Sequence, residues 1–104
     1  MTAKLRNPHP GEILKEEFLD EIGISQNRLA QAIRVPPNRI HDIVRGRRGI
    51  TADTDLRLSR FFRLSEGYWL RLQNACDLMA AHRASDPALQ EIEPYMADDG
   101  SAAS

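Results

Sequence analysis

The feature that most constrains the fold of this chain is a pair of adjacent prolines, Pro36-Pro37, inside an otherwise helix-forming stretch. The stretch runs from Ser25 to Gly46 and reads SQNRLAQAIRVPPNRIHDIVRG. A residue that precedes proline is pushed out of the α-helical region, so no helix continues through Val35. Proline is tolerated in the first turn of a helix, because its missing N–H would have no helical partner there. The sequence therefore predicts two short helices joined by a turn, with Pro37 in the first turn of the second helix.

Each of these two predicted helices has an apolar face. Ser25 is a good N-cap for the first helix. We expect its buried side to consist of Leu29, Ala32 and Ile33. The second helix runs to about Arg45 and stops at Gly46. At 100° per residue, its core face consists of Ile40, Ile43 and Val44.

The other face of the second helix is polar, and this arrangement is typical of a helix-turn-helix motif, whose second helix enters the DNA major groove. That face carries Asn38, Asp42 and Arg45, with Arg39 and His41 at its two edges. Arginine pairs with guanine, asparagine with adenine, and a carboxylate can accept from cytosine. Asp42 has two other possible roles: a salt bridge that positions Arg39 or Arg45, or a plain solvated acid.

Further residues are expected to bind the sugar-phosphate backbone. Gln26 and Asn27 begin the first helix, where side chains and backbone N–H groups can bind a phosphate. Arg47 and Arg48 lie in the following loop. The complete set of predicted DNA-binding residues is Gln26, Asn27, Pro37, Asn38, Arg39, His41, Asp42, Arg45, Arg47 and Arg48. Arg28 is better explained as surface charge, and the sequence leaves open whether Arg57, Arg60 and Arg63 face DNA or a protein.

The distribution of charge agrees with a polyanionic partner for the middle of the chain. The formal net charge is only −1. Residues 25–63, however, contain nine arginines against three aspartates, whereas residues 1–24 and 64–104 are both acidic overall. A basic segment between acidic ends favours nucleic acid as the partner of that segment alone.

The remainder of the chain also predicts helices. One runs from about Pro10 to Ile22 and stops at Gly23, with an apolar face of Ile13, Leu14, Phe18, Leu19 and Ile22. Thr51 caps a helix with an apolar face of Leu56, Leu58, Phe61 and Phe62. Ser65 caps another, which carries Trp69, Leu70, Leu72, Ala75, Cys76, Leu78 and Met79. A last short helix is expected from Asp86-Pro87 to before Pro94.

The expected organisation is one all-α domain, since 104 residues can build a single core but not two. We expect an N-terminal arm (1–9), a helix-turn-helix domain (10–80), a C-terminal helical extension (81–94) and a disordered tail (95–104). No apolar run is long enough to span a bilayer, and the N-terminus lacks the apolar core of a signal peptide, so the expected compartment is the cytoplasm, in association with the nucleoid.

The sequence gives little support to an enzyme. His9, His41, His82 and Cys76 lack the spacing of metal ligands, and no glycine-rich phosphate loop follows a strand. Cys76 lies on an apolar helix face, where a structural thiol is expected rather than a nucleophile. We therefore expect no catalytic residue, no metal and no cofactor.

Five segments together resemble a known family: HPGEIL (9–14), EEFL (16–19), SQNRLAQAIRVPPNRI (25–40), GRRGITADT (46–54) and YWLRLQ (68–73). They are similar to HigA/VapI-type antitoxins of the XRE helix-turn-helix superfamily, over about residues 8–79. The resemblance implies a lambda-repressor-like bundle of five to six helices. It also implies an antitoxin that neutralises a HigB-type, RelE-like ribonuclease toxin and represses its own operon as a dimer. Two residues depart from the family pattern: Asp55 replaces a small apolar residue and Arg63 replaces glycine.

A homodimer is expected from both the residues and the resemblance. A single helix-turn-helix contacts too few bases for tight specific binding, so such domains usually pair on palindromic DNA. The candidate interface on the helix after Ser65 consists of Trp69, Leu72, Cys76 and Met79. Trp69 and Leu72 can equally well close the core of one monomer.

Two other functions remain possible at this stage. One is a free-standing prophage-type repressor without a toxin partner. The other is a protein-binding inhibitor whose helix-turn-helix is vestigial, although the arginines of that motif argue against it. The toxin is expected to contact folded helices, either the acidic surface of the first helix or the C-terminal region.

Overall fold

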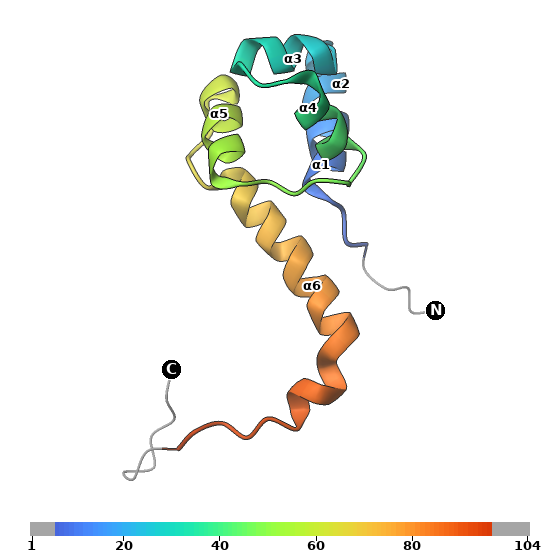
Figure 1. Ribbon diagram of the computed structural model, residues 1–104, viewed down its shortest axis with the longest axis vertical. Coiled ribbons are helices and arrows are strands. Elements are labelled where there is room, and N and C mark those ends of the chain that lie inside the picture. Colours follow the sequence, from blue (N-terminus) through green and yellow to red (C-terminus); the bar gives the residue numbers. More distant parts are fainter. Residues whose placement is uncertain (1–5, 97–104) are drawn as a thin grey trace.

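The computed structural model describes residues 6–96, and this part of the chain holds helices and no strand, as predicted. A helical bundle forms one end of the molecule, and a long helix projects from it (Figure 1). The elements in chain order are α1 (Pro10–Ile13), η1 (Leu14–Leu19), α2 (Asp20–Ile22), α3 (Gln26–Ile33), α4 (Pro37–Val44), α5 (Ala52–Phe62) and α6 (Tyr68–Gln90).

The first predicted helix is present as one continuous helical run, with a π-helical segment, η1, in its middle. His9 caps its N-terminus, since the imidazole Nδ1 accepts a hydrogen bond of 2.9 Å from the Gly11 N–H. The run ends at Gly23, whose φ of 84° is left-handed, as expected for a helix stop. The prediction that Ile22 is buried was wrong, because Ile24, just after the turn, packs against the core instead.

The core lies between the helices of the bundle. Its buried apolar residues are Leu14, Leu19, Leu29, Ala30, Ile33, Val35, Ile40, Ile43, Ile50, Leu58 and Trp69. Phe18 links η1 to the end of α5 and the start of α6, with its ring centroid 4.9 Å from those of both Phe62 and Trp69. Trp69 is 0% exposed, so the first turn of α6 belongs to the same core as the helix-turn-helix.

The buried face of α5 differs from the predicted one. Its centre is Asp55, Leu58 and Ser59, with Phe62 half-buried, which is the i, i+3, i+4, i+7 spacing of one helix face, and Thr54 is buried beside it. Leu56 and Phe61 therefore lie on the other side and are 47% and 39% exposed. The same kind of error affects α3, where Ala30 is buried and Ala32 is exposed.

Asp55 holds the start of α6 against α5. Its buried carboxylate accepts hydrogen bonds from three backbone N–H groups, those of Gly67 (2.6 Å), Trp69 (2.8 Å) and Leu70 (3.1 Å). Trp69 and Leu70 belong to the first turn of α6, whose N–H groups have no partner within the helix, and Gly67 is the residue just before that turn. The prediction of Ser65 as the N-cap was therefore wrong: α6 begins at Tyr68, and Asp55 supplies the acceptor from a neighbouring helix.

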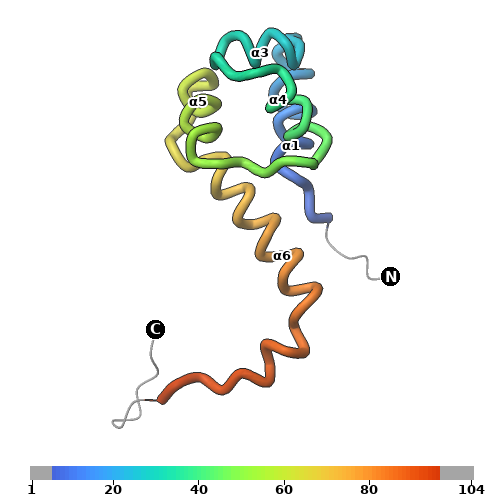
Figure 2. The backbone as a smooth tube through the Cα atoms, in the orientation of Figure 1, coloured from blue at the N-terminus to red at the C-terminus, as the bar shows by residue number. Residues whose placement is uncertain are grey.

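The expected separate helix at Asp86-Pro87 does not form, because α6 continues through Pro87 to Gln90. Proline removes one hydrogen bond from a helix and usually bends it. The last turns of α6, drawn in orange, do change direction (Figure 2). The expected disordered tail, residues 95–104, lies outside the described residues from 97 onward, as do residues 1–5 of the expected N-terminal arm.

Candidate nucleic-acid interface

The placement of α4 depends on an unusually close contact with α1. A Cβ atom added to Gly11 would lie only 1.7 Å from the carbonyl oxygen of Ile43. Glycine at this position therefore lets the two helices meet backbone to backbone. Ile40 and Ile43 are fully buried on the inner side of α4. The helix is thus fixed to α1 and α3 by one face, and its other face is left to solvent.

The outer face of α4 carries the predicted row of polar side chains. Asn38 and Arg45 are exposed, and Asp42 is half-buried. The projecting α6 leaves the bundle away from the labelled α4 (Figure 1), so α6 does not cover this row. Pro37 starts α4 and is exposed, with Pro36 as the N-cap. This surface can therefore approach the edges of DNA bases, which lie at the floor of the major groove.

Asp42 pairs with neither of the two arginines considered from the sequence. Its closest cation is Arg48, with an N–O distance of 3.8 Å. Arg47 and Arg48 are both exposed in the loop after α4, and the Arg47 N–H donates to the Asp42 carbonyl over 2.8 Å. The loop is therefore anchored to the end of α4, with two guanidinium groups at the surface.

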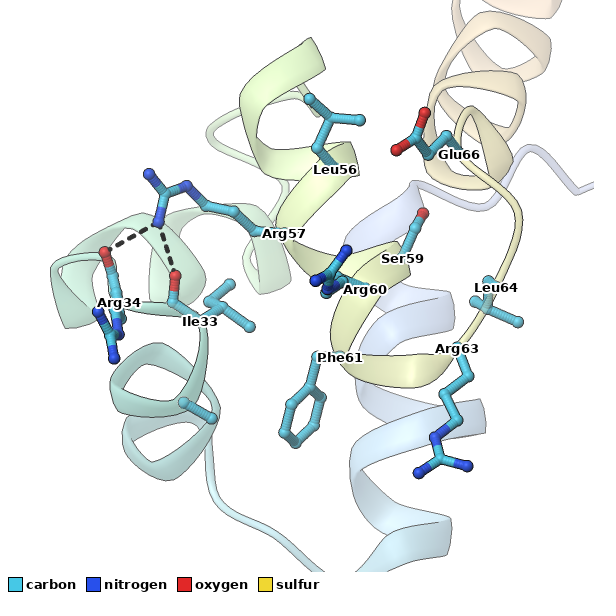
Figure 3. A pocket seen from close by; sticks show the side chains of 11 residues that line it. Ile33, Arg34, Leu56, Arg57, Ser59, Arg60, Phe61, Arg63, Leu64 and Glu66 are labelled. Atoms are coloured by element: carbon cyan, nitrogen blue, oxygen red, sulfur yellow. Dashed lines mark hydrogen bonds between the residues drawn. The ribbon is translucent and has the colours of Figure 1, made fainter.

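Arg39 is held by a partner that the sequence did not indicate. Its Nη1 lies 2.7 Å from Oδ2 of Asp53, at the start of α5. Asp53 also binds Nε of Arg57, whose Nη1 donates to the carbonyls of Ile33 (2.8 Å) and Arg34 (3.3 Å), as drawn in Figure 3. These hydrogen bonds from Arg39 and Arg57 lower the pKa of the Asp53 carboxyl. The network ties α3, α4 and α5 together at one edge of the predicted interface.

A polar hollow lies beside the start of α3. It has a volume of about 410 Å³, and its lining includes Lys15, Ser25, Gln26, Asn27, His41 and Arg45. Within it, His41 Nε2 and Asn27 Oδ1 lie 3.1 Å apart, which joins α3 to α4. The lining also includes Asp20, whose carboxylate lies 3.1 Å from Lys15 Nζ. The N–H groups at the start of α3, together with Lys15 and Arg45, form an arrangement suited to a phosphate, which would compete with Asp20 for Lys15. Lys15, from η1, was missed by the sequence analysis because it lies ten residues before the helix-turn-helix.

The four predicted dimer residues differ in how deeply they are buried. Trp69 was wrong as an interface residue, since it is completely buried in the core of this chain. Leu72 is half-buried and packs against the same core. Cys76 and Met79, farther along α6, are also half-buried. Burial raises the pKa of the Cys76 thiol. Its backbone carbonyl accepts a hydrogen bond of 2.9 Å from Asn7.

Within residues 6–96, no group of three or more His, Cys, Asp or Glu side chains is arranged to hold a metal ion. No helix there combines the length and apolar character that crossing a membrane requires.

Comparison with known proteins agrees with this geometry. Residues 14–69 match a helix-turn-helix family. The chain is 53% identical over 75 residues to virulence-associated protein I of Dichelobacter nodosus, covering 72% of this chain and 69% of that protein. It is 35% identical over 93 residues to antitoxin HigA-1 of Vibrio cholerae, covering 88% and 87%. The solved structure of Pseudomonas aeruginosa antitoxin HigA with the higBA promoter is similar at a TM-score of 0.81 and 44% identity, covering 88% and 100%.

Proposed function

This chain belongs to the XRE-type helix-turn-helix family, as a relative of HigA antitoxins and VapI-like proteins, and from that membership we propose that it represses its own operon as a DNA-binding dimer and neutralises a HigB-type toxin. The family resemblance found in the sequence is thereby confirmed. Members of this family are DNA-binding regulators rather than enzymes.

One observation carries the proposed DNA binding: the row of Asn38, Asp42 and Arg45 on the solvent side of a helix whose other face is fixed in the core. In the proposed complex, α4 lies in the major groove with Asn38 and Arg45 at base edges. Gln26, Asn27 and Lys15 hold one phosphate at the start of α3, and Arg47 and Arg48 follow the backbone beyond α4. Arg39 stays paired with Asp53 and lies at the edge of the major groove, beside the row on α4.

The test compares base-edge residues with backbone residues. We expect Asn38→Ala and Arg45→Ala each to weaken binding to the chain's own promoter by about 1–3 kcal/mol, and to relax preference at one base position. We expect Arg47→Ala to weaken binding to all DNA sequences alike. It should also reduce the slope of log affinity against log salt concentration by about one unit. Fluorescence anisotropy over a series of salt concentrations measures both. Unchanged promoter affinity in Asn38→Ala and Arg45→Ala would contradict the assigned face.

The proposed toxin is a small basic ribonuclease of the RelE-like fold, encoded beside this chain. This part of the proposal is supported by relatives named as antitoxins. It is tested by expressing the neighbouring reading frame with and without this chain and measuring RNA cleavage. RNA cleavage that disappears when this chain is present supports the antitoxin function. A neighbour that is not a ribonuclease favours the second candidate, a free-standing prophage-type repressor, which the same α4 surface would serve.

A further inference from the structure

An apolar groove lies on the bundle, on the side of α5 that faces the end of α3. It has a volume of about 720 Å³, and its apolar lining includes Leu56 and Phe61, which are 47% and 39% exposed. Figure 3 shows Phe61 projecting from α5 toward the end of α3. Leu56 and Phe61 therefore give the groove an exposed apolar surface.

The rim of this groove is basic. Arg34, Arg57, Arg60 and Arg63 line it, against the single acid Glu66. Arg57 is occupied by Asp53 and by two carbonyls, but Arg34, Arg60 and Arg63 form no ion pair with any acid of residues 6–96. An occupant of this groove should therefore be both apolar and acidic.

The backbone provides a second indication at the same place. Arg34 and Arg63 are the non-glycine residues with positive φ in the described chain, at 62° and 60°, and both line the groove. Each follows the end of a helix, in the position where glycine is favoured because a Cβ atom is strained in the left-handed conformation. Strain that is retained at two arginines of one rim points to a function for their side chains.

The end of the described chain has the matching composition. Residues 91–96 read EIEPYM, with Glu91 and Glu93 between apolar side chains that have little to pack against. Ile92, Tyr95 and Met96 are 66%, 72% and 57% exposed. A cluster of large apolar side chains left in solvent marks an interaction surface. In its own chain, this segment hangs at the far end of α6, away from the bundle (Figure 1).

We propose that residues 91–96 of one copy dock in the groove of a second copy, and the reverse, so that the dimer is closed by two equal contacts. The register of α6 supports this arrangement. Met79 is the middle residue of α6, Tyr68–Gln90. If two α6 helices pack antiparallel about Met79, Gln90 of one copy comes level with Tyr68 of the other, so the segment after Gln90 starts beside the bundle of the second copy. The half-buried Cys76 and Met79 then lie at the centre, and Glu91 and Glu93 approach the arginine rim.

This inference rests on the proposed dimer and specifies its interface. The test is sedimentation equilibrium of the full chain, with charge reversal on each side separately. We expect Arg60→Glu with Arg63→Glu, or Glu91→Lys with Glu93→Lys, to weaken the dimer by about tenfold or more, and all four changes together to restore most of the affinity. Glu16→Lys with Glu17→Lys, on the exposed face of η1, changes charge equally and should leave the dimer unchanged. Circular dichroism checks that each variant is folded.

A separate variant removes the rim charge while relieving backbone strain. Arg63→Gly should raise the free energy of unfolding, because glycine accepts the left-handed conformation. It should nevertheless weaken the dimer severalfold. A purely structural role for Arg63 would instead predict a more stable protein with an unchanged dimer constant, and that result would count against the proposal.

Cross-linking identifies which copy fills the groove. In a Cys76→Ser background, a chain with Ile92→Cys is mixed with a chain with Leu56→Cys, and oxidation should yield a disulfide-linked pair of the two. Absence of that pair, or charge reversals that leave the dimer intact, would overturn this interface while the proposed repressor stands. A chain that is monomeric at all concentrations would overturn the dimeric repressor itself, and this inference with it.

Discussion

His9 begins the first helix through a neutral imidazole nitrogen. Its Nδ1 accepts from the Gly11 N–H, and only an unprotonated nitrogen can accept. Burial lowers the pKa of His9, although the nearby carboxylates of Asp77 and Glu12 act in the opposite direction. The folded state therefore binds a proton at this site less readily than the unfolded chain, whose histidine has an ordinary pKa of 6.5.

The first prediction concerns pH. Because the folded pKa of His9 is depressed, its stabilising contribution is complete above pH 6.5 and is lost as the pH falls through the folded pKa. We expect the free energy of unfolding in urea to fall between pH 7.5 and 5.5, with a loss limited by the value of an N-cap, about 1 kcal/mol. His9→Asn, which caps without titrating, should remove this part of the pH dependence. An equal fall in His9→Asn would contradict the assignment.

The second prediction concerns Asp55, a buried carboxylate that three backbone N–H groups share. Asp55→Asn replaces one charged oxygen by an amide group and should cost about 1–3 kcal/mol of stability, and Asp55→Ala should cost more because three donors lose their acceptor. Urea denaturation measures both. Asp20→Asn, at an exposed carboxylate, is the control and should change stability little. A value for Asp55→Asn as small as that of the control would contradict the capping role.

At the scale of elements, the contact between α1 and α4 leaves no room for a side chain at Gly11. A third prediction follows, because Gly11→Ala places a methyl group against the backbone carbonyl of Ile43 and the helices must separate. We expect a loss of about 1–3 kcal/mol or more, as for other overpacked cores, together with weaker promoter binding as α4 moves. Gly23→Ala is the control: it meets open space and should cost only the left-handed penalty, without affecting DNA affinity.

The elements that local signals define were predicted well from the sequence. Pro36 and Pro37 fixed the boundary between α3 and α4, and Ser25 and Thr51 cap α3 and α5 as expected. Prediction failed where polar residues enter the core, as Asp55 and Ser59 do, because an apolar pattern cannot mark them. It also failed at α6, where Pro87 was read as a helix start.

The residues of the candidate site were likewise predictable only where their position depends on a single helix. The outward direction of Asn38 and Arg45 follows from 100° per residue, a property of α4 alone. The pairing of Arg39 with Asp53 and the position of Lys15 depend on how α5 and η1 pack beside α4, and no local pattern contains that information. From the sequence, Trp69 could belong either to a dimer interface or to the core of one monomer, and its complete burial places it in the core.

At the scale of the whole molecule, the chain is far from spherical. Its radius of gyration is 18.1 Å, against about 13 Å for a compact chain of roughly this length. The difference comes from α6, which carries the last described residues away from the bundle (Figure 2). The basic groove and the acidic segment thus lie at opposite ends of one chain. The segment of one copy can therefore reach the groove of a second copy but not its own.

The principal extents of 57, 37 and 21 Å also affect how this protein behaves in a gel-filtration experiment. An elongated particle has a larger Stokes radius than a sphere of equal mass. We expect even the 11.8 kDa monomer to elute ahead of a globular standard of its own mass, so that a calibration curve overstates its mass. Multi-angle light scattering on the eluting peak gives the true mass. Without it, a single stretched chain can be mistaken for a pair.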